Sequence, residues 1–129
     1  MIAVDTNIII RFLTHDDEQQ YKKAFSIFNR NNIFISDTVI LETEWVLRYA
    51  YKFSSDDICN ALINLFGLAN VHLANPSSIA QAIQWHKQGL DFSDALHLTQ
   101  AHQCEKLVTF DKRFSSKAKN LVSCSVVLV

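Results

Sequence analysis

Short apolar runs alternate with longer amphipathic stretches along this chain. The apolar runs predict five strands, at 2–4, 33–35, 71–73, 106–110 and 125–129. Helical periodicity predicts helices at 7–13, 16–29, 38–51, 56–67, 77–88, 92–104 and 112–118. The strongest runs are continuously apolar, which is typical of parallel strands covered on both faces. The alternation therefore predicts an α/β layer fold around a mostly parallel sheet of about five strands.

Helix start signals support several of these assignments. Ser54 with Asp57 resembles a capping box, Pro76 suits a first helical position, and Asp91 can cap the helix that follows it. With 129 residues, of which 49% are hydrophobic, the chain is long enough to bury a core, and we expect a single domain over residues 1–129.

Composition excludes several classes of function. The net charge of −1 gives no overall attraction to nucleic acid, so any such binding needs a local patch or a bound metal. The three cysteines form no CxxC pair, and the two glycines are too few for a phosphate-binding glycine-rich loop. No signal peptide and no apolar stretch of about 20 residues is visible. We expect a protein of the reducing cytoplasm with no membrane association.

Four acidic residues interrupt or directly follow apolar stretches: Asp5, Glu42, Asp94 and Asp111. A carboxylate in apolar surroundings is costly unless something pairs with it, and four together repel unless a cation neutralises them. Oxygen ligands alone favour a hard cation, Mg²⁺ or Mn²⁺, and hence phosphate chemistry.

The order of these acids along the chain favours convergence. Asp5 ends the first predicted strand and Asp111 follows the fourth, so both are expected at the carboxyl edge of the sheet, where α/β proteins bind ligands. Glu42 and Asp94 lie early in helices and could reach that edge.

Each acid also has a purely structural interpretation. Asp5, Asp91 and Asp111 could simply cap helices. Glu42 shares its predicted helix face with apolar residues, namely Val39, Trp45, Val46 and Tyr49. Glu44 instead has Arg48 four residues on, which predicts an ordinary surface pair.

Other charged residues receive simpler assignments. Asp16, Asp17 and Glu18 are expected to complement a helix dipole. Lys112 and Arg113 adjoin Asp111 and could hold a phosphate backbone. The five histidines show no metal-ligand spacing.

Four segments in this order resemble the PIN-domain ribonucleases, and most of all the VapC-type toxins of toxin–antitoxin pairs. They are Val4-Asp5-Thr6-Asn7, Val39-Ile40-Leu41-Glu42-Thr43 with Trp45-Val46-Leu47, Asp91-Phe92-Ser93-Asp94-Ala95-Leu96, and Leu107-Val108-Thr109-Phe110-Asp111 with Phe114.

The resemblance implies a three-layer α/β/α sandwich and a metal-dependent endoribonuclease that hydrolyses RNA. It implies that Asp5, Glu42, Asp94 and Asp111 bind Mg²⁺ or Mn²⁺ and carry catalysis. Accessory roles fall to Asp91, Thr6, Asn7 and Thr109. It further implies a small antitoxin as partner in a type II pair, and a homodimer, for which the apolar stretch 60–68 and Trp45 offer surface.

Three alternatives remain to be weighed. A receiver domain needs paired acids after the first strand and a lysine after the last, and a dehalogenase-type phosphatase needs a second acid after Asp5; neither pattern is present. The stronger alternative is a PIN-like binding or scaffold module without catalysis, which would not need four intact carboxylates.

Overall fold

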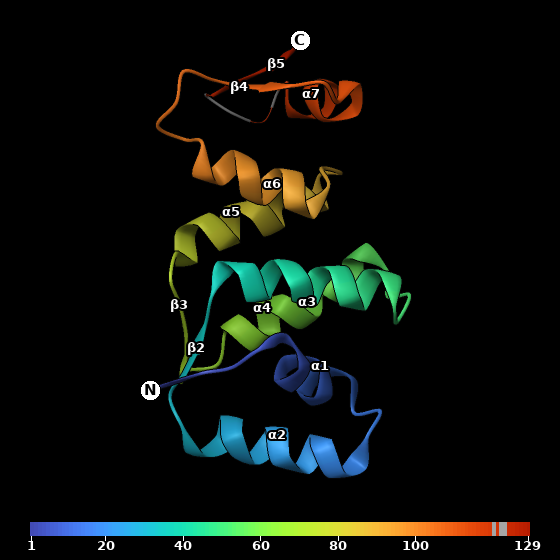
Figure 1. Ribbon diagram of the computed structural model, residues 1–129, viewed down its shortest axis with the longest axis vertical. Helices are drawn as coiled ribbons and strands as arrows, with labels where there is room; N and C mark the ends of the chain where they lie inside the picture. Colours follow the sequence, from blue (N-terminus) through green and yellow to red (C-terminus); the bar gives the residue numbers. More distant parts are fainter. Residues whose placement is uncertain (120, 122–123) are drawn as a thin grey trace. The chain divides into compact units, whose positions relative to one another are not determined.

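The structure is a computed structural model that describes residues 1–119, 121 and 124–129 (Figure 1). Its elements, in chain order, are β1 (Ile2–Ala3), α1 (Thr6–Thr14), α2 (Glu18–Arg30), β2 (Ile33–Ile35), α3 (Asp37–Tyr49), α4 (Ser55–Phe66), β3 (Val71–Leu73), α5 (Pro76–Lys87), α6 (Phe92–Gln100), β4 (Lys106–Thr109), α7 (Lys112–Ala118) and β5 (Ser125–Leu128). All the predicted elements are present within a few residues of the expected bounds. The largest difference is α6, which stops four residues early.

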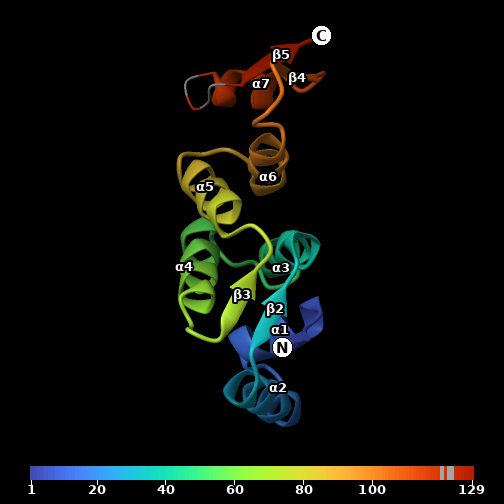
Figure 2. The ribbon, with the colours of Figure 1, turned by 90° about the vertical axis from the view of Figure 1, so that its left-hand side faces the viewer.

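The chain forms two compact units, Met1–Pro76 and Ser77–Val129. In the first unit, β1, β2 and β3 form a parallel sheet in that order, with Ile33 of β2 opposite Ile2 and Val71. Figure 2 shows β2 and β3 side by side. Helix α4 packs against β3, and α1 packs against α2 and α3. Ile33 and Ile35 are fully buried, so β2 lies at the centre of this core.

In the second unit, β4 and β5 pair in parallel, and α7 packs against both strands. All strand pairs in the described residues are thus parallel, as predicted. We expected one sheet of about five strands. The strands instead form a sheet of three and a sheet of two, since β1 and β4 belong to different units. No helix within the described ranges is long and apolar enough to cross a membrane.

Capping residues define the helix ends as the sequence indicates. The Ser54 side chain accepts a hydrogen bond from the Asp57 backbone N–H at 3.1 Å, and Pro76 is the first residue of α5. Gly89 follows α5 with φ 105°, a conformation that residues with a side chain rarely adopt.

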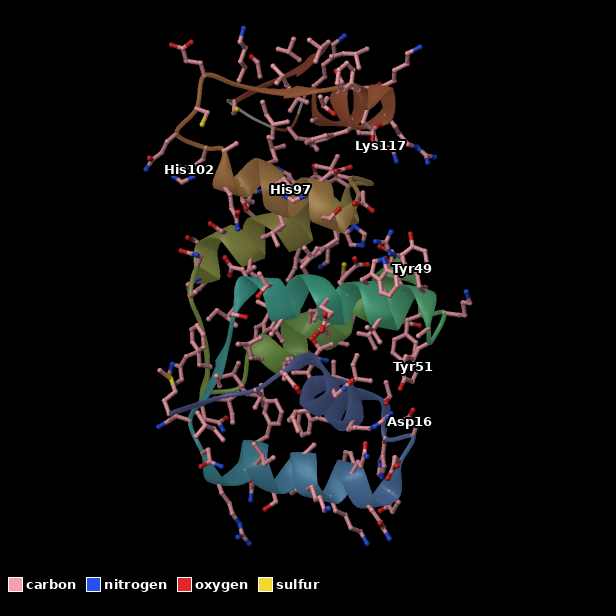
Figure 3. All side chains as sticks on the ribbon, in the orientation of Figure 1. Asp16, Tyr49, Tyr51, His97, His102 and Lys117 are labelled. Atoms are coloured by element: carbon pink, nitrogen blue, oxygen red, sulfur yellow. The ribbon has the colours of Figure 1, made fainter. Side chains whose placement is uncertain are left out.

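Asp16 does not begin a helix, which corrects its predicted dipole role. Helix α2 starts at Glu18 with Asp17 as its cap. Asp16 instead accepts hydrogen bonds from Arg11 Nη1 at 2.9 Å and from the Tyr51 hydroxyl at 2.7 Å (Figure 3). These bonds lower the pKa of Asp16, the Tyr51 bond most of all. The carboxylate therefore ties the α1–α2 loop to the turn after α3.

The predicted pair of Glu44 and Arg48 is present, but its predicted surface position is wrong for Glu44. Glu44 is completely buried, and its Oε1 accepts a hydrogen bond from Arg48 Nη2 at 3.0 Å. Its Oε2 lies 3.0 Å from Arg48 Nε in the same ion pair. The buried side of α3 consists of Ile40, Thr43, Glu44 and Leu47. Each helical residue turns the side chain by about 100°, so Trp45 and Tyr49 fall on the exposed side instead.

This burial makes a stability prediction. Arg48→Met should lower the free energy of unfolding by about 3 kcal/mol, because it removes the cation that accompanies a buried carboxylate. Lys22→Met is the matched control, since Lys22 forms an exposed pair with Glu18 at the same spacing and should cost less than about 0.5 kcal/mol. Urea denaturation measures both, and equal effects would contradict the structural role given to the buried pair.

Candidate functional site

Three acids of the predicted site lie in the second unit, around the start of α6 and α7. Asp91 caps α6, with its Oδ2 accepting hydrogen bonds from the Ser93 hydroxyl at 2.7 Å and the Asp94 N–H at 3.3 Å. Asp94 lies in the first turn of α6 and is half-buried. Asp111 follows β4 and caps α7, with Oδ1 accepting from the backbone N–H groups of Arg113 and Phe114 at 2.9 and 3.0 Å.

These three carboxylates influence one another. The pKa of Asp94 is raised, first by burial and then by the negative charges of Asp91 and Asp111. His97, which lies on α6 one turn beyond Asp94 (Figure 3), opposes this rise. The second unit therefore concentrates negative charge around a carboxyl group that burial already makes costly to ionise.

The first unit contains Asp5 and Glu42. Asp5 follows β1 and caps α1, where Oδ1 accepts from the Ile8 N–H at 3.4 Å. Next to it, Thr6 is buried, and its hydroxyl has no hydrogen-bond partner among the described residues, while Asn7 is exposed. Glu42 projects from the exposed side of α3 rather than from the apolar face that the sequence suggested.

The capping interpretation is thus correct for Asp5, Asp91 and Asp111. It does not exclude ligand binding, because a cap of this kind uses one carboxylate oxygen. Within the described residues, Oδ2 of Asp5 and Oδ2 of Asp111 make no hydrogen bond to the protein. Capping fixes the direction of each carboxylate at a helix start, and the second oxygen can still bind a ligand.

The described residues contain no group of three or more histidine, cysteine or acidic side chains arranged to hold one metal ion. The raised pKa of Asp94 does not require such a group. Charges repel one another over far greater distances than the roughly 2–2.5 Å of a metal–oxygen bond. The available donors are carboxylate oxygens, which suit Mg²⁺ and Mn²⁺. That the four acids share one ion stays a prediction.

Neighbouring polar residues differ in their roles. The Thr109 hydroxyl accepts from the Asp111 N–H at 3.0 Å and so orients that acid. Lys112 and Arg113 are exposed in the first turn of α7. Lys117 donates to the Gly89 carbonyl at 2.8 Å, so it helps to hold α7 against the α5–α6 turn (Figure 3).

Asp37 is a further acid at the sheet edge, for which the sequence predicts only a cap or turn role; Ser36 is the cap, and Asp37 is the first residue of α3. It follows β2, as Asp5 follows the neighbouring parallel β1, so both lie at the carboxyl edge of one sheet. Its Oδ2 accepts from the Asn75 amide at 3.1 Å, and its Oδ1 is buried with no partner in the described part of the chain. Its position two residues after the apolar run 33–35 was the available signal.

The crowding of Asp94 makes a prediction about stability and pH. Its pKa in the folded protein lies above the ordinary value of 3.8, so folding favours the neutral form, and this stabilisation is lost as pH rises through the folded pKa. In EDTA, Asp94→Asn should therefore melt a few degrees higher than the parent protein at pH 7, and this difference should shrink toward pH 4.

Circular dichroism melting curves at both pH values test this. Asp56→Asn is the control, because Asp56 is an exposed acid in the first turn of α4. An Asp94→Asn variant that melts below the parent protein at pH 7 without metal would contradict the proposed repulsion.

Comparisons with known proteins agree with the resemblance noted above. The curated protein sequences contain no match to the chain. Among solved structures, the crystal structure of the sarcin-ricin loop cleaving toxin VapC20 from Mycobacterium tuberculosis is similar, with 20% identity, coverage of 97% of this chain and 99% of that one, and a TM-score of 0.44. A likeness at this level transfers neither activity nor target. The family model of the PIN domain matches residues 2–120, so the protein belongs to the PIN domain family.

Proposed function

We propose that this protein is a metal-dependent endoribonuclease, the toxin of a type II toxin–antitoxin pair. Family membership supports a nuclease of this kind. The observation that carries the proposal is the concentration of carboxylates in the second unit, where burial and then the charges of Asp91 and Asp111 raise the pKa of Asp94. Acids arranged to repel one another are costly for a fold, and a divalent cation removes that cost.

We propose Asp5, Glu42, Asp94 and Asp111 as the ligands of Mg²⁺ or Mn²⁺, with Asp91 as an accessory acid. When bound, the cation would lower the pKa of a water molecule and offset negative charge on the phosphate. The protein's own contribution is orientation: the backbone N–H groups at the start of α7 hold Asp111 through Oδ1, and Thr109 holds its N–H. We assign Thr6 and Asn7 to the support of Asp5.

The reaction is a hydrolysis of an RNA phosphodiester bond. The oxygen of water bonds to phosphorus as the bond to the 3′ oxygen breaks, and the departing oxygen takes up a proton. The products carry 5′-phosphate and 3′-hydroxyl ends. Lys112 and Arg113 are exposed beside Asp111 and supply positive charge for the RNA backbone, which the net charge of −1 does not.

The proposed partners are a small antitoxin and a second copy of the chain, in the cytoplasm. The stretch 60–68 supplies some surface for such contacts. Ile63 and Leu68 are exposed there, whereas Leu62 and Leu65 are buried in the core of the first unit. These two exposed aliphatic side chains supply a modest apolar area for such contacts.

A PIN-like binding module is the rival proposal, and capping is the observation that favours it. Three of the five acids have a structural task as helix caps, which a protein without catalysis would also need. Glu42 and Asp94 cap no helix. The two proposals therefore differ in whether these two residues bind a metal ion.

Removal of one ligand acid should abolish cleavage. We expect Asp5→Asn to cut RNA at least about a hundredfold more slowly than the parent protein in Mg²⁺, because it loses charge stabilisation worth several kcal/mol. Asparagine caps helices as well as aspartate does, so the fold should persist. A gel assay on total RNA, with and without EDTA, measures the rates. Cleavage at the parent rate would refute the assignment.

Metal should also stabilise the fold. Mg²⁺ added up to millimolar concentrations should raise the melting temperature of the parent protein by mass action, since the ion binds the folded state. Asp94→Asn and Glu42→Gln should respond much less, and Asp56→Asn as strongly as the parent. A melting curve indifferent to Mg²⁺ would favour the binding module.

A further inference from the structure

Two large aromatic side chains are exposed on helix α3 where the sequence pattern suggested a buried face. Trp45 is 56% exposed and Tyr49 is 49% exposed. Their ring centroids are 5.1 Å apart with an interplanar angle of 49°. At positions i and i+4 they lie one turn apart on one side of the helix, and Tyr49 lies close to its C-terminal end (Figure 3).

A buried ion pair holds this aromatic pair in place. The Arg48 guanidinium contacts the completely buried Glu44 carboxylate at 3.0 Å through both Nε and Nη2. The same guanidinium lies over the Tyr49 ring, with its central carbon 4.7 Å from the ring centroid. Arg48 thus connects the core of the first unit to an exposed ring, which reduces the freedom that Tyr49 would lose on binding a ligand.

The face also carries Glu42, which we propose as a metal ligand. Glu42, Trp45 and Tyr49 follow one another at helical spacing, and all three are exposed. Seven residues of helix span about 10 Å, so the rings begin next to the proposed reaction centre and extend away from it. Lys52, exposed just beyond the helix, adds a positive charge near the far end of this row.

The surroundings favour nucleic acid over protein as the occupant. Rings of this kind carry about 150–250 Å² each, so the half-exposed pair offers roughly 200 Å², a quarter of the ~800 Å² that each partner gives to a stable protein interface. Charged residues border the pair, whereas protein interface cores are depleted of charge. Exposed aromatic rings with nearby cations are the usual means of binding unpaired bases.

We infer that Trp45 and Tyr49 form a stacking platform for unpaired bases of the RNA substrate, next to the phosphate that is cleaved. This inference rests on the proposed ribonuclease function and adds to it the two side chains that hold the bases. It also changes the role of Trp45, which was offered above as surface for the homodimer that the family resemblance implies.

The test is RNA affinity in an Asp94→Asn background, where cleavage should not interfere. Fluorescence anisotropy with a short, labelled, single-stranded RNA of mixed sequence reports binding. Trp45→Leu and Tyr49→Leu should each weaken binding by about tenfold, because leucine keeps apolar area but lacks a π face. Phe25→Leu is the matched control, since Phe25 is a similarly exposed aromatic on α2 and should leave affinity unchanged.

An RNA with abasic nucleotides provides the second arm. The protein with Trp45 should bind this RNA about tenfold more weakly than the normal RNA. Trp45→Leu should then cause no further loss of affinity for the abasic RNA, because ring and base act as one interacting pair. Equal additional losses for both RNAs would show that Trp45 acts without contacting a base, and the inference would be overturned.

Two further outcomes separate this inference from the proposed function. If the parent protein cuts RNA and its Asp94→Asn form binds RNA, but adding Trp45→Leu leaves that affinity unchanged, the platform is wrong and the ribonuclease proposal stands. If Trp45→Leu instead changes the sedimentation of the protein while RNA affinity is unaltered, the face is a protein contact and the inference fails. A parent protein that neither cuts nor binds RNA refutes both the ribonuclease proposal and the platform.

Discussion

Parallel strand pairing determines where most of the proposed chemistry can occur. Parallel strands leave their sheet on the same side, so residues that follow them gather at one edge. In the first unit, Asp5 follows β1 and Asp37 follows the adjacent β2. In the second unit, Asp111 follows β4, whose pairing with β5 is also parallel. Each acid then caps or begins a helix, so the turn from strand to helix both ends the sheet and directs a carboxylate.

Capping does not exclude the proposed metal binding by Asp111, because capping uses only one of its carboxylate oxygens. One oxygen of Asp111 accepts two backbone N–H groups and thereby fixes the side chain. The other oxygen stays available for a ligand. Asp94 is different, because burial and two neighbouring acids raise its pKa, and His97 only opposes that rise. The structural acids therefore make the site rigid, while Asp94 makes it costly in the absence of a cation.

The sequence predicts the elements well and the orientation of α3 poorly, for physical reasons. Strand positions and helix bounds depend on local periodicity and caps such as Ser54, which the sequence displays directly. The buried side of a helix depends on its neighbours. Val39, Trp45 and Val46 looked like the inner face, but Ile40, Glu44 and Leu47 occupy it. An error of one residue rotates the face by about 100°. Whether Asp5, Glu42, Asp94 and Asp111 come together depends on tertiary folding. Local sequence patterns indicate this only indirectly.

That rotation joins stability to recognition. Burial of Glu44 requires a nearby cation, and Arg48 is the cation one turn away. Once Arg48 is held there, its flat guanidinium provides a surface on which Tyr49 can lie, and Trp45 packs against Tyr49 in turn. A leucine pair at these two positions would satisfy the same helix geometry without using the guanidinium. The presence of aromatic rings beside a fixed cation, on the side that carries Glu42, is therefore better explained by a ligand with flat faces and negative charge than by packing of the fold itself.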